Sequence, residues 1–583
     1  MAVIFAKCLG KPGPPGSRTV PARLRRARFG LVLTLQGFIV GIAIDWAGRA
    51  LRKFSNFWTL LLMHLEAVHS APRPYLIALR WRLLGKKLRA RSQMAPLLGK
   101  SPRAYHLWIE RQETRPHTTH AACAAPESRP IIALVDAGGG ETRLAETLES
   151  LASEGLSRLL IGGPDGLSIK DAPDHIAWSD MPWLMPMAAG DILAPRAAEI
   201  YRSAIAKTQG QIVYADDDLI DHAGQRSAPH FKPDWNGELF RHFDFLTGAC
   251  AVHASRECLA SVSDADWAQT VVARTLGSEA PVHVPHILHH RRSRPLPLVP
   301  TAPAMSAYRQ LPRVSVIIPT RNGLDLLQTC LSGLQGTEYP DMEILIVDNG
   351  SDDRDTLTFL AGIESETCKV LKFPGAFNFS AINNHAAAQA GGEMLCLLNN
   401  DVEMLEPHWL TIMVEQALRE NVGAVGAQLL YPDGRIQHSG VVLGVGGGAA
   451  HAHRLLRPDE EGYFRRHALP QFVSAVTAAC LVVSRERFMA VGGFDERNFA
   501  VAFNDVDLCM RLNRRGWHSL YEPRARLIHH ESVSRGLDRD PVGAARLAGE
   551  LAQLKFLWAT DRIVDPFHHP QLSPFSEHFV PRL

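Results

Sequence analysis

The sequence predicts an α/β protein with two similar domains in tandem behind a helical appendage. From Pro130 an apolar strand, a helix and a second apolar strand follow one another, and the same order returns from Val314. At 583 residues the chain is too long for one ordinary hydrophobic core. We expect a leader and helical region at 1–129, a first α/β domain at 130–292, a proline-rich linker at 293–312, a second α/β domain at 313–562 and a tail at 563–583.

Composition narrows the class of protein. An apolar content of 46%, a charged content of 21% and a net charge of +2 describe a globular chain and argue against a nucleic-acid binder. The nine cysteines never form a Cys-x-x-Cys pair, which argues against a zinc site or a disulfide framework. A reducing compartment follows, so we expect a cytoplasmic protein.

The amino-terminal region carries signals of membrane contact. Basic residues at 23–28 precede an apolar run at 30–44, which is shorter than the roughly 20 residues of a spanning helix. A second apolar patch lies at 57–65, and a basic cluster lies at 86–91. One interpretation is one or two in-plane helices docked on an anionic membrane face, the inner face of the cytoplasmic membrane. The alternatives are helices that cover a domain, or an unstructured leader.

The two α/β domains resemble each other in sequence. Each contains a Thr-x-Ala-Cys segment, then an Asp-x-Asp pair, then a His-His pair near its carboxyl end; the matching residues are 247–250, Asp264 and His289–His290 in the first domain, and 477–480, Asp505 and His529–His530 in the second. A shared order at similar intervals indicates an internal duplication. The first domain is shorter between its second strand and the acidic turn that holds Asp191, so we expect that it lacks a segment.

An apolar run in the second domain, residues 394–398, ends in Asn399, Asn400 and Asp401. A buried strand that delivers polar residues to its carboxyl end is where an open α/β sheet holds a ligand. We interpret Asp401 as a carboxylate ligand of a metal ion. The alternative is a polar turn that merely closes the strand.

Two earlier strands end in polar residues as well. The first ends in Pro319, Thr320 and Asn322, and the second ends in Asp348. Side chains at adjacent strand ends can converge on one crevice, where a carboxylate can accept hydrogen bonds from a base or from ribose hydroxyls. Asp348 is therefore the candidate nucleotide contact, and a turn-forming Asp before Asn-Gly is the alternative.

Several segments in fixed order carry a resemblance. They include VSVIIPTRNG, EILIVDNGSDD, FNFSAINN, LLNNDVE, GRIQHSGVVLG, FNDVDLCMRL and IHHESVSRG. The chain resembles the family 2 glycosyltransferases of the GT-A fold, which is Rossmann-like, and in particular the two-domain bacterial kind associated with O-antigen and other surface polysaccharides. The resemblance is dense over about 313–562 and looser over 130–292.

The resemblance implies metal-dependent, inverting transfer of a hexosyl or deoxyhexosyl group from a nucleotide-sugar to a lipid-linked or polysaccharide acceptor. The metal, Mg²⁺ or Mn²⁺, would be held by Asp401 and by His529, with His530 as the alternate choice. Asn399 stands where the family has the first acid of its Asp-x-Asp motif. The nucleotide-sugar would contact a set of strand-end and helix residues: Pro319, Thr320, Asn322, Asp348, Asn383, Asn399 and Asn400.

Inversion by single displacement requires a base for the acceptor hydroxyl. Asp505 occupies the place of the family's base, with Asn504 where many relatives have Glu; capping of the following helix is the alternative role. Asp507 and Arg511 are expected to support the site. His438 lies beside the glycine-rich loop at 441–453, which we interpret as a lid or acceptor-side loop or as a plain surface loop.

The first domain lacks an acid at its second strand end and the equivalent of FNFSAINN. We therefore expect a degenerate copy that packs against the active domain or holds acceptor. Two alternatives stay open. Both domains could be active transferases, with Asp191, Asp264 and His289 echoing Asp401, Asp505 and His529, or the chain could be a non-catalytic scaffold that binds nucleotide or glycan.

Overall fold

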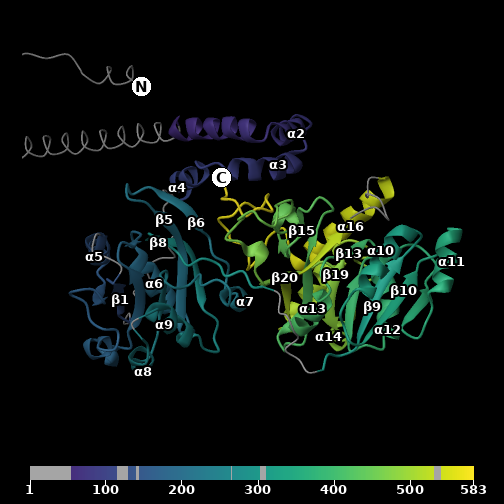
Figure 1. Ribbon diagram of the computed structural model, residues 1–583. Coiled ribbons are helices and arrows are strands. Elements are labelled where there is room, and N and C mark those ends of the chain that lie inside the picture. Colours follow the sequence, from purple (N-terminus) through teal and green to yellow (C-terminus); the bar gives the residue numbers. More distant parts are fainter. Residues whose placement is uncertain (1–53, 114–128, 139–142, 264, 302–309, 531–539) are drawn as a thin grey trace, which may run out of the picture. The chain divides into compact units, whose positions relative to one another are not determined.

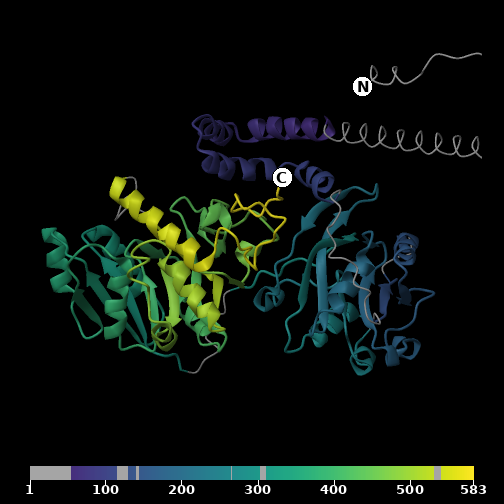
Figure 2. The same ribbon diagram turned by 180° about the vertical axis from the view of Figure 1, so that it is seen from behind.

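A computed structural model describes residues 54–113, 129–138, 143–263, 265–301, 310–530 and 540–583. The chain divides into two compact units, Met1–Leu65 and Glu66–Leu583. In the first unit the described residues, 54–65, are helical, and the apolar run at 30–44 lies outside the described residues. The second unit contains three helices followed by two separate sheets (Figures 1 and 2).

The three helices are α2 (Pro72–Leu83), α3 (Lys87–Gly99) and α4 (Ala104–Gln112). Helices α2 and α3 pack against each other, and α4 packs against strand β6 (Arg226–His230) of the first sheet. The Trp108 ring of α4 lies 4.9 Å from the Phe231 ring, centroid to centroid. Within the described ranges, no helix has both the length and the apolar run that crossing a bilayer requires.

The first sheet has the strand order β2-β1-β3-β7-β5-β8-β4, with β6 paired to β5. Its remaining strands are β1 (Ile131–Asp136), β2 (Ser157–Ile161), β3 (Trp183–Ala188), β4 (Ile192–Leu193), β5 (Ile212–Ile220), β7 (Cys250–Val252) and β8 (Val282–Arg291). Helices α5 (Leu144–Ser153) and α6 (Ala197–Ile205) share one hydrophobic core with the sheet, while α7 (Gly237–Phe240), α8 (Arg256–Ala260) and α9 (Trp267–Thr275) share another.

The second sheet has the strand order β11-β10-β9-β12-β19-β14-β20-β13, with β15 paired to β14 and β18 paired to β20. Its strands are β9 (Val314–Thr320), β10 (Met342–Asp348), β11 (Cys368–Lys372), β12 (Met394–Leu398), β13 (Val402–Met404), β14 (Val422–Leu430), β15 (Ile436–His438), β18 (Gln471–Val473), β19 (Cys480–Ser484) and β20 (His518–His529). A separate hairpin joins β16 (Val441–Leu443) to β17 (Ala449–His451).

Helices cover both faces of the second sheet (Figures 1 and 2). Helices α10 (Leu324–Gln335), α11 (Arg354–Gly362) and α13 (Trp409–Ala417) pack on one face; α12 (Phe379–Gln389), α14 (Arg485–Ala490), α15 (Asn504–Arg514) and α16 (Pro541–Trp558) pack on the other. Alternate residues of β9 enter the two cores, Val316 and Ile318 on one side and Ile317 on the other. A strand buried on both faces reads as a continuous apolar run, which is how β9 and β12 appear in the sequence. The predicted α/β architecture is confirmed.

The two sheets follow the same plan. Strands β1, β2, β3 and β4 take the places of β9, β10, β12 and β13, and β7, β5 and β8 take those of β19, β14 and β20. Strand β11 and helix α12 have no counterpart in the first domain, where the connection from β2 to β3 contains two short 3₁₀ helices, η3 (Ala172–His175) and η4 (Trp178–Asp180). The first copy therefore lacks the segment whose absence its sequence indicates.

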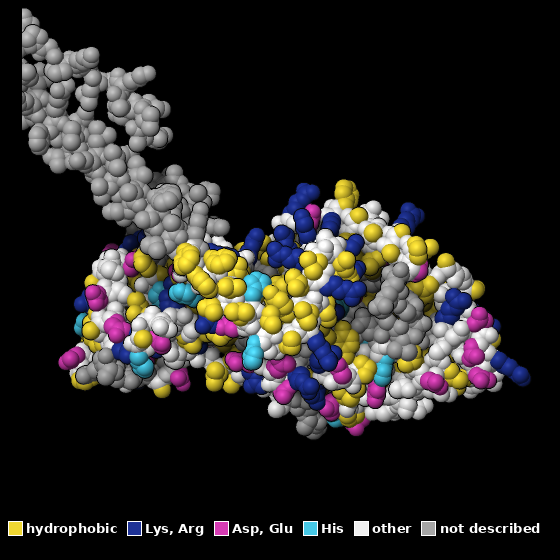
Figure 3. Space-filling model, turned by 90° about the horizontal axis from the view of Figure 1, so that it is seen from above, with side chains coloured by type: hydrophobic (Ala, Val, Ile, Leu, Met, Phe, Trp, Pro, Cys, Tyr) yellow, Lys and Arg dark blue, Asp and Glu magenta, His cyan; other side chains and the backbone are white. Residues whose placement is uncertain are grey.

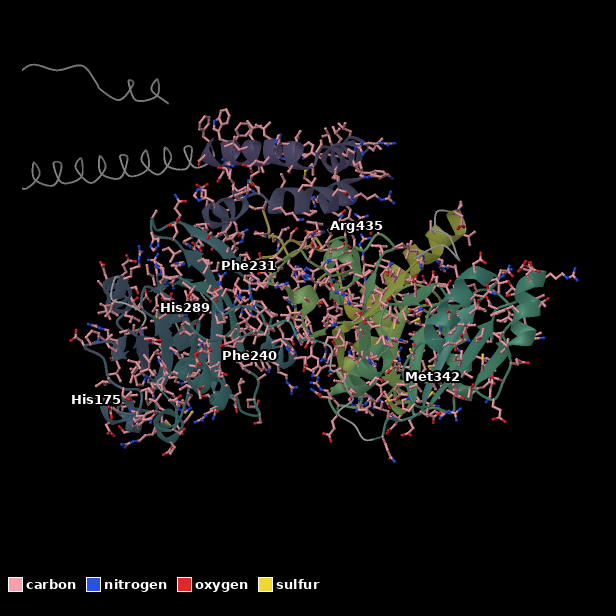
Figure 4. All side chains as sticks on the ribbon, viewed as in Figure 1. His175, Phe231, Phe240, His289, Met342 and Arg435 are labelled. Carbon is pink, nitrogen blue, oxygen red and sulfur yellow. The ribbon has the colours of Figure 1, made fainter. Side chains whose placement is uncertain are left out.

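Strand register corrects one detail of the duplication. The residue after Asp401, Val402, pairs with His529. The residue after Asp191, Ile192, pairs with His290. His290 is thus the counterpart of His529, and the expectation that His289 fills this place is wrong by one residue. His289 instead lies among the strands and helices of the first domain (Figure 4), where its Nε2 atom is 2.8 Å from the Tyr201 hydroxyl. Asp264 lies outside the described residues.

Candidate active site

A cavity of about 1180 Å³ opens at the carboxyl ends of β9 and β12. Its lining includes eight of the residues that the sequence singles out: Pro319, Thr320, Asn322, Asn399, Asn400, Asp401, Asp505 and His529. The other five are not part of this lining: Asp348, Asn383, His438, Asp507 and Arg511. The position is the one where open α/β sheets hold ligands, and the volume suits a ligand larger than a single sugar.

Asp401 and His529 meet at one edge of this cavity, and both are buried. The pairing of β13 with β20 brings them together, because Val402 lies opposite His529. Asp401 Oδ1 is 3.1 Å from His529 Nε2. The Asn399 amide nitrogen lies 3.3 Å from the same ring nitrogen. Asn399 and Asp401 of the predicted metal-binding turn therefore lie within hydrogen-bond distance of His529.

The hydrogen bonds around His529 indicate which ring nitrogen carries the proton. His529 Nδ1 lies 2.7 Å from Gln437 Oε1, and because a carbonyl oxygen only accepts, Nδ1 carries the proton. In the neutral ring Nε2 carries a lone pair, which faces the Asn399 amide nitrogen at 3.3 Å and Asp401 Oδ1 at 3.1 Å. Asp401 Oδ1 is a buried oxygen for which the described residues supply no hydrogen-bond donor. Two electron-pair donors facing each other are an unfavourable pair unless a cation lies between them. Carboxylate and neutral imidazole thus fit a divalent cation here.

The ends of β9 and β10 are tied together by Asn322. Its backbone adopts a left-handed conformation, with φ of 53°. Its amide group donates to Asp352 Oδ1 at 2.7 Å and accepts the backbone N–H groups of Asp352 and Asp353 at 3.0 and 3.1 Å. The Asn322 side chain is therefore occupied in shaping this corner of the cavity, and its contact with nucleotide remains a prediction.

Asp348 and Asn383 are both buried behind the cavity wall. Asp348 Oδ1 accepts the Ser351 backbone N–H at 2.8 Å, which is the turn-forming role that the sequence leaves open as an alternative. The Asn383 amide donates to the Phe379 carbonyl at 2.8 Å, within α12. Asn400 donates to Thr320 Oγ1 at 3.1 Å, so the β9 and β12 ends are also joined directly.

Asp505 lies at the start of α15, on the wall of the cavity. The residue before α15, Phe503, is its N-cap and adopts a left-handed φ of 60°, which is uncommon for an aromatic residue. Asp505 Oδ1 accepts the Val506 N–H at 2.8 Å, and Oδ2 accepts the Ala478 N–H at 3.2 Å. Burial raises the pKa of the Asp505 carboxyl above its ordinary value, and the backbone donors lessen that rise.

Asp507 and Arg511 hold α15 in place rather than lining the cavity. The Arg511 guanidinium donates to Asp507 Oδ2 at 2.8 Å, and Trp558 of α16 donates its indole N–H to Asp507 Oδ1 at 2.9 Å. Arg511 also donates to the Val491 carbonyl at 2.6 Å. The pair therefore joins α15 to α16 and orients the helix whose first turn carries Asp505.

The glycine-rich segment at 441–453 contains the β16–β17 hairpin and its connecting turn. The contact of this turn with the tail does not support its interpretation as a lid. Gly446 donates its N–H to the Pro574 carbonyl at 2.9 Å, which ties the turn to the tail. His438 is fully buried and does not reach the cavity. Its Nδ1 atom is 2.8 Å from Nδ1 of His451, the last residue of β17, which does line the cavity.

The His438–His451 contact fixes the tautomer of His451. Nε2 of His438 accepts the backbone N–H groups of Gly440 and Thr477, both at 3.4 Å, so its Nδ1 carries the proton. That proton is donated to Nδ1 of His451, which places the His451 proton on Nε2. Burial, with Arg454 and His529 nearby, lowers the pKa of His451 to about 4. His451 is therefore a neutral hydrogen-bond donor on the wall of the cavity.

Sequence reasoning missed part of the lining. The missed residues include Tyr431, Gln437, His451, Arg454 and Arg546. Arg454 is 2.9 Å from Glu577 Oε2 in the tail, and Arg546 belongs to α16, so both reach the cavity from segments far from the motif strands. Gln437 lies within GRIQHSGVVLG, one of the segments that carry the family resemblance, and His451 lies within the glycine-rich loop at 441–453, but neither signal identified these two side chains.

The corresponding place in the first domain is built differently. Asp191 Oδ1 accepts the Arg292 backbone N–H at 2.8 Å, and Arg291 Nε lies 3.7 Å from the other carboxylate oxygen. Burial raises the pKa of Asp191 to about 6. His290 Nδ1 is 2.7 Å from Asp218 Oδ1. Arg291 thus lies beside the Asp191 carboxylate, whereas in the second domain His529 Nε2 lies beside the Asp401 carboxylate.

One further group, Asp216, His283 and His569, has ligand atoms within 4.8 Å of one another, close enough for a metal ion. His569 Nδ1 accepts the Gln571 backbone N–H at 3.0 Å, so its proton is on Nε2, which lies 2.9 Å from Asp216 Oδ2. Burial alone raises the pKa of Asp216, but His569 and His283 hold it below its ordinary range. We interpret the group as an ion-pair network that joins the tail to the first sheet.

Comparison with known proteins places this geometry in a family. The model of Glycosyl transferase family 2 matches residues 315–483, which contain β9, β12 and the Asp401 turn. The chain is 38% identical over 440 residues to the protein y4gI of Sinorhizobium fredii, covering 67% of this chain and 48% of that one. It is 35% identical over 470 residues to the O-antigen biosynthesis protein RfbC of Myxococcus xanthus, covering 72% of this chain and 37% of that one.

A shorter relative is matched over most of its length. The N-acetylglucosaminyl-diphospho-decaprenol L-rhamnosyltransferase of Mycobacterium tuberculosis is 30% identical over 229 residues, which are 35% of this chain and 71% of the relative. By contrast, the matches span less than half of the length of y4gI and of RfbC. The chain belongs to glycosyl transferase family 2.

Proposed function

We propose that the chain is an inverting, metal-dependent glycosyltransferase that moves a hexosyl or deoxyhexosyl group from a nucleotide-sugar to a lipid-linked or polysaccharide acceptor of the cell surface. The observation that carries this proposal is one cavity, at the carboxyl ends of the motif strands, that Asp401, His529 and Asp505 all line. The relative RfbC is an O-antigen biosynthesis protein and the mycobacterial relative is a rhamnosyltransferase, and both support this proposal. We further propose that the chain acts as a peripheral protein on the inner face of the cytoplasmic membrane.

Asp505 is the proposed base. An acceptor hydroxyl is a very weak acid, so it attacks the anomeric carbon only if a nearby group removes its proton. The Asp505 carboxylate is fixed by two backbone N–H donors, and its raised pKa makes it a stronger base than an exposed aspartate. In single displacement the acceptor oxygen bonds to the anomeric carbon as the bond to the diphosphate breaks, and the hydroxyl proton passes to Asp505.

Asp401 and His529 are the proposed ligands of a divalent cation, Mg²⁺ or Mn²⁺. When bound, such a cation supplies charge neutralisation for a diphosphate leaving group. Gln437 holds the His529 ring with Nε2 directed toward Asp401 and the Asn399 amide, and Asn399, in place of a second acid, leaves Asp401 as the single carboxylate of its turn. Arg454 and Arg546 add positive charge to the wall of the cavity, where an anionic donor would lie.

His451 is proposed to donate its fixed Nε2–H to an oxygen of the donor. Replacing it by Leu removes that donor, while Gln keeps an N–H of similar reach. We expect His451→Leu to lower kcat/KM by about tenfold, the size of one neutral hydrogen bond of about 1.4 kcal/mol. His451→Gln should recover most of the loss. Steady-state kinetics with the preferred nucleotide-sugar measures both, and equal kinetics for wild type and His451→Leu would contradict the role.

We propose that the first domain is a degenerate copy that packs against the second domain or holds acceptor. The support is the arginine beside Asp191 and the connection that lacks β11 and α12 counterparts. We expect Asp191→Asn to retain at least half of the wild-type transfer rate, because Asn can still accept the Arg292 N–H. The matched variant is Asp401→Asn at the corresponding position. Complete loss of transfer in a folded Asp191→Asn chain would show that both domains are active.

The proposed function is tested first by ligand binding. Purified chain is heated with a panel of nucleotide-sugars, with Mn²⁺ or Mg²⁺ and with a chelator. Binding to the folded state raises Tm, by an amount that corresponds to about 2.7 kcal/mol when ligand is at 100 times its Kd. We expect one nucleotide-sugar to raise Tm only when metal is present. If no nucleotide-sugar stabilises the chain under any condition, the proposal fails.

A further inference from the structure

We infer that the tip of the α2–α3 hairpin, residues 82–91, docks on an anionic lipid surface. This inference deepens the peripheral membrane contact proposed above by naming the surface, and it draws on the described residues of the second compact unit alone. The tip consists of the last turn of α2, a tight connection at Leu84–Lys86 and the first turn of α3.

The charged residues of this hairpin are all basic. From Pro72 to Lys100 the sequence contains eight Lys and Arg residues and no Asp or Glu. The whole chain is nearly balanced, with 62 basic and 60 acidic residues, so this concentration is a local feature. The basic side chains of the tip, all exposed, are Arg82, Lys86, Lys87, Arg89 and Arg91. Clustered Lys and Arg beside a helix are attracted to the negative surface of a membrane that contains anionic lipids.

Apolar side chains stand among these charges. Leu83 is 80% exposed, Leu84 56% and Leu88 54%, which are high values for leucines on packed helices. On the outer face of α2, Leu76 and Ile77 are exposed as well. Figure 3 views the molecule from the side on which α2 and α3 lie in Figure 1, and hydrophobic side chains gather there beside Lys and Arg side chains.

The connection at the tip is ordered before any partner binds. Gly85 adopts a left-handed φ of 71°, which glycine reaches without strain. The Lys86 N–H donates to the Trp81 carbonyl at 2.9 Å, and the Lys87 N–H donates to the Gly85 carbonyl at 2.9 Å. The Arg89 guanidinium lies over the Trp81 ring at 5.1 Å. The leucines are therefore presented together at a fixed turn, and little ordering entropy is lost on docking.

The combination selects a lipid surface over the other anionic partners. Lysine and arginine stems can lie along the headgroups while leucines enter the boundary between headgroups and acyl chains. A nucleic acid offers its phosphates to the same cations but no apolar layer for three exposed leucines. Two signals, charge and apolar burial, are also what stable peripheral anchoring requires.

The test is cosedimentation of the full-length chain with lipid vesicles that contain neither acceptor lipid nor nucleotide-sugar. Vesicles are made of phosphatidylcholine alone or with about one third phosphatidylglycerol, a fraction at which surface attraction is strong. We expect binding only to the anionic vesicles and a loss of binding at high salt. The double variants Lys86→Glu/Lys87→Glu and Leu83→Ser/Leu84→Ser should each weaken the binding at least tenfold.

Controls separate this inference from the glycosyltransferase proposal. Arg354→Glu/Arg497→Glu makes the same change of charge at exposed arginines elsewhere and should bind vesicles as wild type does. Transfer to a detergent-dissolved acceptor should be equal in the tip variants and wild type, so a chain without transferase activity leaves the vesicle result intact. Vesicle binding that both tip variants retain, or tighter binding to an RNA of similar charge than to anionic vesicles, would overturn the inference.

Discussion

Asp505→Asn is expected to lower kcat by about 10³-fold, within the range that general base catalysis supplies. The variant should still bind the nucleotide-sugar, because Asn has the size of Asp and keeps one of the two oxygens that accept the Ala478 and Val506 N–H groups, but it cannot take up a proton. Isothermal titration calorimetry of nucleotide-sugar binding and single-turnover transfer, measured on the same preparation, separate the effect on binding from the effect on catalysis. Asp325→Asn is the matched control, since Asp325 is an exposed acid on the same cavity wall. Undiminished transfer by Asp505→Asn would remove the base assignment.

The same carboxyl gives a pH dependence of known sign. Asp505 acts in its charged form, and burial raises its pKa, so transfer should fall as the pH drops through a value above that of an ordinary aspartate. A raised pKa also means that the folded chain is more stable with Asp505 protonated, and that this stability is lost as the pH rises through that pKa. In Asp505→Asn the removal of the buried charge opposes the loss of one acceptor for a backbone N–H, so we expect little change of Tm at neutral pH. If the variant has lost activity and its Tm is also clearly lowered, Asp505 has a structural role instead.

Asp401→Asn is expected to lower kcat by about 10²–10³-fold, the cost of losing an electrostatic stabiliser of the leaving group. Asn keeps the shape of the turn but removes the negative charge that faces His529 Nε2. The variant should also lose the metal-dependent rise in Tm with nucleotide-sugar, which is measured without any acceptor. Glu403→Gln is the matched control, because Glu403 is the next acid along the chain, pairs with His530 and does not line the cavity. Equal metal dependence in wild type and Asp401→Asn would contradict the metal site.

The fold was predictable because both sheets are encoded by local patterns. Strands such as β9 and β12 are buried on both faces and appear as continuous apolar runs, and the polar residues that follow them mark the carboxyl edge. The duplication was readable from motifs in matched order. The position of His290, rather than His289, opposite Ile192 was not, because two adjacent histidines look alike in the sequence and only strand pairing shows which of them lies at that place.

The site was predictable only where its residues follow motif strands. Asp401, Asn399 and Asn400 lie at the end of β12, and Asp505 begins a helix, so sequence position and cavity position agree. His451 ends the β16–β17 hairpin and Arg454 follows it; the glycine-rich sequence of this hairpin does not show which side chains face the cavity, and only long-range contacts place them. Asp348 shows the opposite case, since its strand-end position suggested a ligand contact while its carboxylate caps a turn.

The central claim is that this cavity performs metal-dependent glycosyl transfer. The most direct measurement is release of nucleoside diphosphate from the nucleotide-sugar that stabilises the chain, in the presence of a polyprenyl-diphosphate-sugar acceptor, for wild type, Asp401→Asn and Asp505→Asn. The account predicts release by wild type with Mn²⁺ or Mg²⁺, none with a chelator and at least a hundredfold less by either variant. No release by wild type, or equal release by all three chains, would contradict it.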